Sequence, residues 1–427
     1  MKKNILICGE NLNDGGVETT IVNDALILKK SGYNVYVLAE RGIYTKVLEE
    51  AGIENIDFKM EFVNGFDMER AEKIVKIIER KEINEAHIHK FISIPSCLPA
   101  FIITNIPYVV HLHEGLTSSY DWVMNQFTSY RDMLNMYFRN AYKIITITES
   151  VKKYNMDLFD IPEDKYVVIN NSIDLEMFNY NKKASFPIKK FLLISRLSKE
   201  KEQSIKNGIE LFNKYSKKER NCSLRIVGSG TISEKIKEYV RENNYQNIDF
   251  VGRSSEIAKE IFDSDIVLGL GRCIIEAMAS KRICCIIGYE NIKTIVKKDN
   301  IEQAMLENFS GRGIPDETVD SIVRQIKKIS KKELEKIVEE NYLFVKDKLN
   351  LEKNIYTISK TVKVNYSQII KEMFYIIKNT QDERDKHKKQ KEEIWESKQW
   401  LQSELEKKEK EMTNYDVKHI KNKQYML

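Results

Sequence analysis

Residues 265–281, DIVLGLGRCIIEAMASK, place a short apolar run directly before a glycine turn and a helical pattern. Residues 266–268 predict a buried strand, Gly269 and Gly271 predict a tight turn, and the residues from Arg272 onward predict a helix. Glycines let a ligand approach the backbone, and the first N–H groups of a helix attract an anion. The stretch therefore predicts an α/β fold with a phosphate site at a strand end.

Glu276 lies about one turn inside this predicted helix. A carboxylate there could accept hydrogen bonds from two neighbouring hydroxyls, such as those of a ribose. An ordinary strand-to-helix turn has the same residue pattern, because short glycine motifs are common. Other motifs in the chain must decide between the two interpretations.

The composition favours a two-domain protein with an extension. The chain has 427 residues, 42% of them hydrophobic, and a net charge of +5. Because no run of about eighteen apolar residues and no signal peptide is present, we expect a cytoplasmic protein without a membrane-spanning helix. The weak positive charge, without a basic stripe, does not indicate nucleic-acid binding.

The six cysteines show no paired zinc spacing and predict reduced, mostly buried thiols. Cys273, at a predicted helix start, is either a small apolar filler or a thiol with a lowered pKa.

The first half of the chain alternates apolar runs with amphipathic helical patterns, which predicts a parallel sheet covered on both faces. Ligands in such sheets lie beyond the carboxyl ends of the strands. Gly15 and Gly16 open a helix after the first strand and suit backbone contact with a phosphate or sugar, or form a flexible turn. The predicted strands are 5–8, 35–38, 86–89, 108–113, 144–147 and 166–169, and helices are predicted at 69–80 and 130–141.

Two predicted strands end in histidine pairs, His87 with His89 and His111 with His113. Alternation puts each pair on one face of the sheet, and four imidazoles raise a zinc hypothesis. No third type of ligand stands beside them, and strand ends collect polar residues for many reasons. The predictions therefore include no metal site, and His113 is interpreted as a substrate contact.

The second half repeats the alternation after a polar segment at 183–187, which we interpret as the interdomain linker. This pattern predicts a second doubly wound domain. The predicted strands are 191–194, 224–227, 248–251, 266–268 and 284–287, and the helices are 200–215, 233–243 and 256–263.

Cations follow the first strand of this second domain. Arg196 and Lys201 are predicted to face the glycine turn, where two positive charges would stabilise a diphosphate, although solvated surface charge is the alternative. Gly228 belongs to another strand-end turn.

Asp263 and Asp265 form a D-x-D motif at a helix end, where local capping is the favoured interpretation.

In this order the motifs resemble the family 4 glycosyltransferases of the GT-B fold, over about residues 1–350. The matching elements are Gly15-Gly16-Val17-Glu18, His113, Thr148-Glu149-Ser150, Asn171-Ser172-Ile173-Asp174, Ser195-Arg196-Leu197 with Glu200-Lys201, residues 226–230, Phe250-Val251-Gly252-Arg253 and Glu276-Ala277-Met278-Ala279.

The resemblance implies two Rossmann-like domains, residues 1–182 for the acceptor and 188–345 for a nucleotide-sugar donor. It implies retention at the anomeric carbon, with no metal and no cofactor besides the donor substrate. Arg196 and Lys201 would bind the diphosphate, Glu276 the ribose and Arg253 the base. His113 and the Gly15-Gly16 loop would contact the reacting sugar, and Gly228, Gly269, Gly271 and Arg272 would complete the donor site.

The chain departs from the family pattern at three positions. Leu268 stands where the first of two glutamates eight residues apart is usual, Arg272 follows the second glycine, and Glu202 replaces a glycine. Either Arg272 supplies hydrogen-bond donors where a carboxylate normally accepts, or the activity is lost. Glu202 also adds an acidic group near the predicted diphosphate.

Residues 346–379 are predicted to form helices that cross back to the first domain, with apolar residues at 369, 370, 373, 374 and 377. Residues 380–427 are predicted to form a charged helical or coiled-coil tail, with Ile394, Leu401, Leu405 and Met412 at heptad spacing. A protein partner could bind at 380–412, and peripheral membrane contact is a further possibility.

These observations predict a glycosyltransferase that uses a nucleotide-diphosphate sugar and a glycan or lipid-linked acceptor in cell-envelope polysaccharide synthesis. Two alternatives stay open. One is a non-catalytic GT-B partner subunit that assembles through its tail, and the other is a nucleotide-sugar epimerase.

Overall fold

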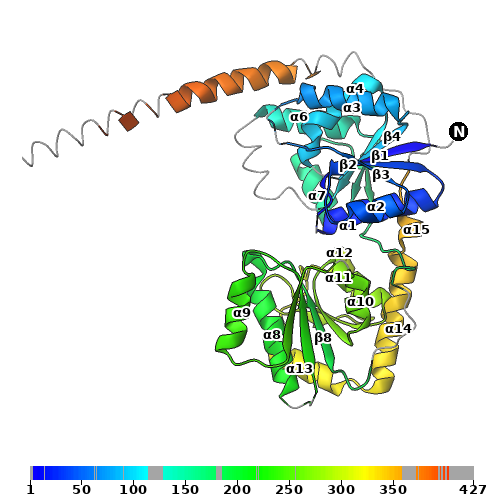
Figure 1. Ribbon diagram of the computed structural model, residues 1–427, viewed down its shortest axis with the longest axis vertical. Coiled ribbons are helices and arrows are strands. Elements are labelled where there is room, and N and C mark those ends of the chain that lie inside the picture. Colours follow the sequence, from blue (N-terminus) through cyan, green and yellow to red (C-terminus); the bar gives the residue numbers. More distant parts are fainter. Residues whose placement is uncertain are drawn as a thin grey trace, which may run out of the picture. The chain divides into compact units, whose positions relative to one another are not determined.

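The computed structural model contains two sheets, each covered by helices on both faces (Figure 1). We call each sheet with its helices a domain. Within the described residues, no helix combines the length and apolar content needed to cross a membrane. The structure describes residues 3–13, 15–61, 63, 65–89, 91–113, 128–178, 185–217, 219, 221–254, 256–357, 372–373, 375–392, 395, 398–399 and 402.

Backbone contacts divide the chain into two units. The larger unit contains both sheets and comprises Met1–Phe62, Asp67–Thr117 and Tyr137–Val364. The smaller unit comprises Val63–Phe66, Ser118–Met136 and Asn365–Leu427.

The first sheet has seven parallel strands in the order β3-β2-β1-β4-β5-β6-β7. The strand order reverses between β1 and β4, which is where doubly wound sheets open a crevice for ligands. The strands are β1 (Asn4–Asn11), β2 (Asn34–Glu40), β3 (Glu54–Asp57), β4 (Glu85–Ile88), β5 (Tyr108–Leu112), β6 (Lys143–Thr146) and β7 (Tyr166–Val168).

Two helices of the first domain, which begin after Asp67 and Thr148, have side-chain caps. The Asp67 side chain accepts a hydrogen bond from the Arg70 backbone N–H, and Thr148 accepts one from Val151. The helices are α1 (Gly16–Lys30), α2 (Thr45–Glu50), α3 (Met68–Arg80), α4 (Ile94–Thr104), α6 (Thr128–Asn140) and α7 (Glu149–Leu158), with short 3-10 helices η1 (Phe91–Ser93) and η2 (Glu163–Lys165).

The second sheet has six strands in the order β10-β9-β8-β11-β12-β13, with only the β12–β13 pair antiparallel. Its order reverses between β8 and β11. The strands are β8 (Lys190–Ile194), β9 (Ser223–Val227), β10 (Ile248–Gly252), β11 (Ile266–Gly269), β12 (Ile283–Ile286) and β13 (Thr294–Ile295).

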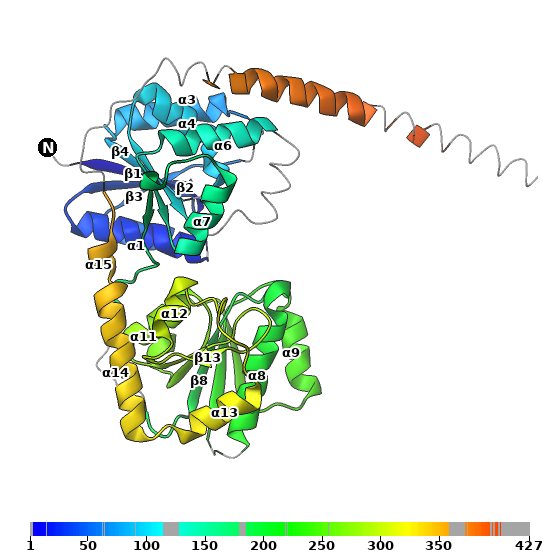
Figure 2. The ribbon, with the colours of Figure 1, turned by 180° about the vertical axis from the view of Figure 1, so that it is seen from behind.

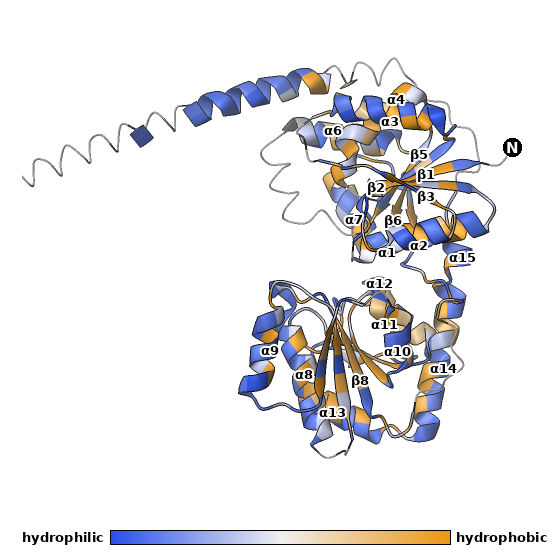
Figure 3. Ribbon diagram, in the orientation of Figure 1, coloured by the Kyte–Doolittle hydropathy of each residue, from blue (hydrophilic) through white to orange (hydrophobic). Residues whose placement is uncertain are grey.

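The central strands of this sheet are mainly apolar (orange in Figure 3), and their side chains belong to two separate cores. Leu193 pairs with Leu268 in the core on one face, and Leu192 pairs with Val267 in the core on the other. The helices are α8 (Glu202–Ser216), α9 (Ser233–Glu242), α10 (Ile257–Phe262), α11 (Arg272–Ala279), α12 (Ile301–Leu306), α13 (Val319–Lys328), α14 (Lys331–Lys348) and α15 (Leu351–Asn354), with 3-10 helix η3 (Lys199–Lys201) before α8.

Helix α14 packs on α11, and the chain then returns to the segment that follows the first sheet (Figure 2). The Ile173 backbone N–H donates to Leu349 O at 2.9 Å, and Leu351 N–H donates to Ile173 O at 3.0 Å. Lys30 on α1 contacts Glu352 on α15 at 2.7 Å. Residues 349–354 therefore contact the first domain.

The predicted fold class, two doubly wound α/β domains, is confirmed. The sequence prediction missed β3 and β13, because β3 carries acidic residues at both ends and β13 has only two residues. Residues 375–392 are helical. The predicted apolar residues 369, 370 and 374 and the heptad positions Ile394, Leu401, Leu405 and Met412 lie outside the described residues.

Asp265 joins β11 to the start of the second domain. It is 2% exposed, and its carboxylate accepts backbone N–H bonds from Ser185, Lys189 and Lys190, each at 2.9 Å. The D-x-D motif therefore has a structural role at this position, in agreement with the capping interpretation.

We predict that Asp265→Ala lowers the free energy of unfolding of the second domain by about 3 kcal/mol, because three buried N–H groups lose a charged acceptor. The measurement is urea unfolding followed by circular dichroism. The control is Asp249→Ala, which removes an exposed ion pair with Arg225 and should cost less than about 0.5 kcal/mol. Equal losses in the two variants would contradict the structural role of Asp265.

All six cysteines are buried and unpaired: Cys8, Cys97, Cys222, Cys273, Cys284 and Cys285. Burial raises the pKa of the Cys273 thiol to about 12, although this thiol stands near the start of α11. Its Sγ lies 3.3 Å from the Leu270 carbonyl oxygen. The interpretation of Cys273 as an apolar filler is therefore favoured over a reactive thiolate.

We predict that the native protein shows no rapid reaction with Ellman's reagent at pH 8, because the thiols are buried. Denaturant should release all six. Rapid reaction of one native thiol that disappears in Cys273→Ser would show a thiolate at α11 instead.

Candidate active site

The reversal of strand order in the second sheet brings two of the predicted motifs to one edge. β8 and β11 are parallel neighbours, so the loops after Ile194 and Gly269 leave the sheet on the same side. Arg196 follows β8, and only Leu270 and Gly271 separate β11 from α11. This is the position at which doubly wound sheets bind ligands.

Glycines permit close packing at this edge. Gly271 has φ +70° at the N-cap of α11. A Cβ on Gly269 would lie 2.4 Å from Cys273 Sγ, and one on Gly228 would lie 1.9 Å from Ser195 O. The geometry requires glycine at these positions, so packing accounts for them whether or not a ligand binds.

Lys201 lies at the end of η3 and is partly buried. Burial lowers the pKa of its ammonium group; the neighbouring Cys273 raises this pKa and Arg196 lowers it. Arg196 is more exposed and pairs with Glu200 at 3.4 Å. The structure therefore brings Arg196 and Lys201 within electrostatic range of each other, and Lys201 within range of Cys273 in the first turn of α11.

Glu202 does not add an unpaired negative charge here. Its carboxylate contacts Lys206 at 2.7 Å and Lys235 at 2.8 Å. Two lysines therefore compensate the acidic group that replaces the usual glycine.

Arg253 follows β10, as predicted, and its Nε donates to Ser229 Oγ at 2.8 Å in the turn after β9. The Gly228 N–H donates to Gly252 O at 2.8 Å, which joins the same two strand ends. Arg253 thus lies on the strand-end side of the second sheet.

Glu276 is paired with Arg272 inside α11. Arg272 Nε lies 3.1 Å from Glu276 Oε1, and both side chains are about one-tenth exposed. Burial raises the pKa of Glu276, and Arg272 lowers it. Arg272 Nη1 also lies 3.4 Å from Thr20 Oγ1 on α1. A ribose would therefore share the Glu276 carboxylate with Arg272.

Leu268 lies within β11 and is fully buried in the core. Because the turn between β11 and α11 has only two residues, the position eight residues before Glu276 falls inside the sheet. Leu268 therefore serves the core of this domain at the position where the glutamate was expected.

The four histidines at the ends of β4 and β5 form one contiguous array. His87 Nδ1 lies 3.0 Å from His111 Nε2, and His89 Nδ1 lies 3.0 Å from His113 Nε2. His89 stacks on His111 with 4.1 Å between ring centroids. Burial lowers the pKa of both His89 and His111 well below the usual range, so both are neutral at pH 7.

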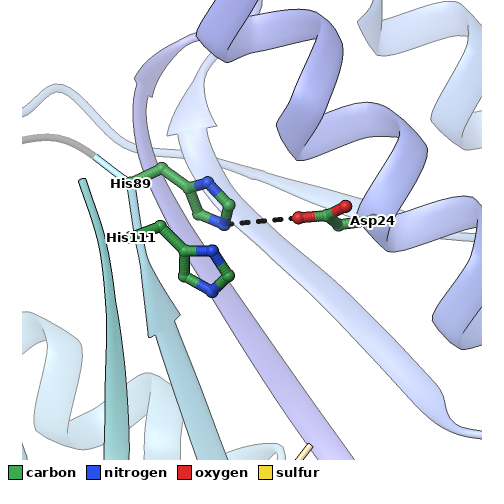
Figure 4. Close-up of side chains that lie close together, drawn as sticks. All are labelled: Asp24, His89 and His111. Carbon is green, nitrogen blue, oxygen red and sulfur yellow. Dashed lines mark ion pairs between the residues drawn. The ribbon is translucent and has the colours of Figure 1, made fainter. Parts of the chain in front are cut away.

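Asp24 on α1 completes this array, and sequence analysis missed it. Its Oδ2 lies 3.9 Å from His89 Nε2 (Figure 4). Burial raises the pKa of Asp24 to about 7, and the positive charge of Arg272 lowers it. The available signal was the polar pair Asn23-Asp24 inside the otherwise apolar run 21–28.

A pocket brings part of the predicted site together with this array. Its lining includes Asn23, Asp24, His111, His113 and Arg272. Of the predicted residues, only His113 and Arg272 belong to the lining. Glu114 and Gly115, which follow His113, lie outside the described residues.

The predicted glycine pair lies elsewhere. Gly15 is the N-cap of α1, and a Cβ there would lie 2.0 Å from the Glu18 carboxylate. A Cβ on Gly16 would meet no atom within 4 Å among the described residues. The pair therefore opens α1, as expected, without lining the pocket.

Two family profiles cover most of both domains. Residues 14–177 match Glycosyltransferase Family 4, and residues 179–342 match Glycosyl transferases group 1. No curated protein matches the chain.

Solved structures share this architecture at low sequence identity. A glycosyltransferase from Rickettsia africae is 18% identical with a TM-score of 0.60, over 88% of this chain and 99% of that chain. Anabaena HepE, in complex with UDP and glucose, is 15% identical with a TM-score of 0.59, over 82% and 96%. S. aureus TarM, in complex with UDP, Fondaparinux and alpha-GlcNAc-glycerol, is 13% identical with a TM-score of 0.53, over 88% and 99%.

At these identities the likeness shows the fold, and the two profiles show the family. The chain belongs to the family 4 glycosyltransferases and has their two-domain GT-B fold.

Proposed function

We propose that this protein transfers a sugar from a nucleotide-diphosphate donor to a glycan or lipid-linked acceptor in cell-envelope polysaccharide synthesis. The transfer proceeds with retention at the anomeric carbon and without a catalytic metal ion. One observation supports the proposal: Arg196 and Lys201 follow β8, whose end lies beside the end of β11, directly before α11 begins. The acceptor class and the stereochemistry rest on the family.

The two cations suit a diphosphate that departs as the leaving group. Charge builds on the diphosphate as its bond to the sugar breaks, and fixed positive groups stabilise that charge most in the transition state. The first-turn N–H groups of α11 add a partial positive charge. Lys201 is the stronger contributor because it is partly buried, whereas the Arg196 side chain is 71% exposed.

Arg272 and Glu276 are assigned to the nucleotide and sugar hydroxyls. Arg272 Nη2 is buried and has no hydrogen-bond partner among the described residues, so a ligand oxygen would satisfy it. The Arg272–Glu276 pair then holds both groups in place before the donor binds. His113 lines the pocket and is assigned to the reacting sugar.

HepE and TarM were solved with UDP, which makes uridine diphosphate sugars the first donors to test. A lipid-linked acceptor would require peripheral contact with the inner membrane surface, and residues 380–412 are the segment proposed for a protein partner.

The experiment incubates purified protein and EDTA with UDP-, GDP- and ADP-sugars and candidate acceptors, and measures released nucleoside diphosphate. NMR of the product reports the anomeric configuration. Turnover would exclude the non-catalytic alternative. A melting point raised by UDP without any turnover would support that alternative instead.

We predict that Lys201→Met lowers kcat about 100-fold, because one charge that stabilises the leaving diphosphate is lost. The matched control is Lys199→Met, which removes an exposed lysine of the same 3-10 helix and should retain near-wild-type kcat. Equal kcat in the two variants would remove Lys201 from the proposed site.

A further inference from the structure

Asp24, His89 and His111 converge from three different elements of the first domain. Asp24 lies on α1, His89 directly follows β4, and His111 lies in β5 (Figure 4). One ligand atom from each lies within 4.8 Å of the other two. Asp24 and His89 are buried, and His111 is partly buried.

The hydrogen bonds of the array determine which ring nitrogens face this cluster. His89 uses Nδ1 for His113, which leaves Nε2, and this atom is buried with no hydrogen-bond partner among the described residues. His111 uses Nε2 for His87, which leaves Nδ1. An imidazole nitrogen whose partner nitrogen carries the ring proton can act as an electron-pair donor.

The ring nitrogens of His89 and His111 that point away from the cluster are hydrogen-bonded, as they are in known metal sites. In such sites the second ring nitrogen of a ligating histidine is hydrogen-bonded, and that bond orients the ring. Here His113 holds His89 and His87 holds His111, each at 3.0 Å. His87 is in turn held by Glu85, with 2.7 Å between Nε2 and Oε1.

The distances favour an ion over a direct contact. The 3.9 Å between Asp24 Oδ2 and His89 Nε2 is too long for a hydrogen bond. Ligand atoms of a tetrahedral zinc ion, with bonds of about 2.0–2.2 Å, lie roughly 3.4 Å apart. This pair would have to close by about 0.5 Å to reach the ligand spacing, and a separation at the 4.8 Å limit of the cluster would have to close by roughly 1.4 Å.

The charges around the cluster also admit a cation. Arg272 is the positive group that acts on Asp24, and it is itself paired with Glu276. Two carboxylates therefore face one guanidinium in this region. A divalent ion would bind the Asp24 carboxylate in place of its interaction with Arg272, and the Arg272–Glu276 ion pair would stay intact.

We propose that Asp24, His89 and His111 form a binding site for a divalent transition-metal ion of the zinc class. Two imidazoles and one carboxylate are a common zinc ligand set, with the fourth position open. Asp24 and His111 also line the pocket, so that position is accessible to water or a ligand. The ion ties α1 to the ends of β4 and β5 and takes no part in stabilising the diphosphate.

The experiment titrates the chelator-treated full-length protein with Co²⁺ and records visible absorption. We expect one Co²⁺ per chain with the intense bands of tetrahedral coordination, displaced by Zn²⁺. Absence of these bands, together with no Zn²⁺ retained on dialysis, would overturn the proposal and leave the space to a water molecule.

Substitutions of the proposed ligands, and of the histidine that orients one of them, test where the ion binds. Asp24→Asn and His111→Gln should weaken Co²⁺ binding at least tenfold, and His87→Gln, which removes the ring that links His111 to Glu85, should weaken it about tenfold. The control His387→Gln changes a histidine of the helical residues 375–392 and should bind normally. Circular dichroism and the melting point in EDTA check folding. Unchanged binding in Asp24→Asn, or equal weakening in His387→Gln, would place the ion elsewhere and contradict the site.

Discussion

The parallel pairing of β8 with β11 is the constraint on which the second domain depends. The register of Leu193 with Leu268 aligns the two strands so that both end at the same edge of the sheet. Since β9 and β10 lie on one side of this pair and β12 on the other, the loops after β8 and β11 diverge. Arg196 and Lys201 follow β8 and α11 follows β11, so all three lie at the edge where doubly wound sheets bind ligands.

The short turn after β11 explains how this chain departs from the usual glutamate pair of its family. Gly269 packs against Cys273, and Gly271 adopts a positive φ, so the strand passes into the helix within two residues. Because this turn is so short, Leu268 lies in the core and Arg272 lies in the first turn of α11. Arg272 then pairs with Glu276 one helical turn later, so the guanidinium is held against the Glu276 carboxylate.

In the first domain, the edge of the sheet at the carboxyl ends of the strands carries histidines. Its strand order reverses between β1 and β4, and the ends of β4 and β5 carry neutral imidazoles in place of cations. Stacking and hydrogen bonds link all four rings, and Asp24 adds a buried carboxylate from α1. An array of this kind orders the strand ends, which is compatible with a sugar beside His113 and with a metal ion beside His89.

The sequence by itself determined the two doubly wound domains, because apolar strands, amphipathic helices and glycine turns are local patterns. It also placed Arg196, Lys201, Arg253 and Glu276 on the strand-end side, since in a parallel sheet that side follows from chain direction alone. Only the tertiary structure decided that Glu276 is paired with Arg272, that Leu268 is a core residue, and that Asp24 meets His89. Those facts depend on turn length and on how a helix is rotated over its sheet, and neither is encoded in the spacing of one segment.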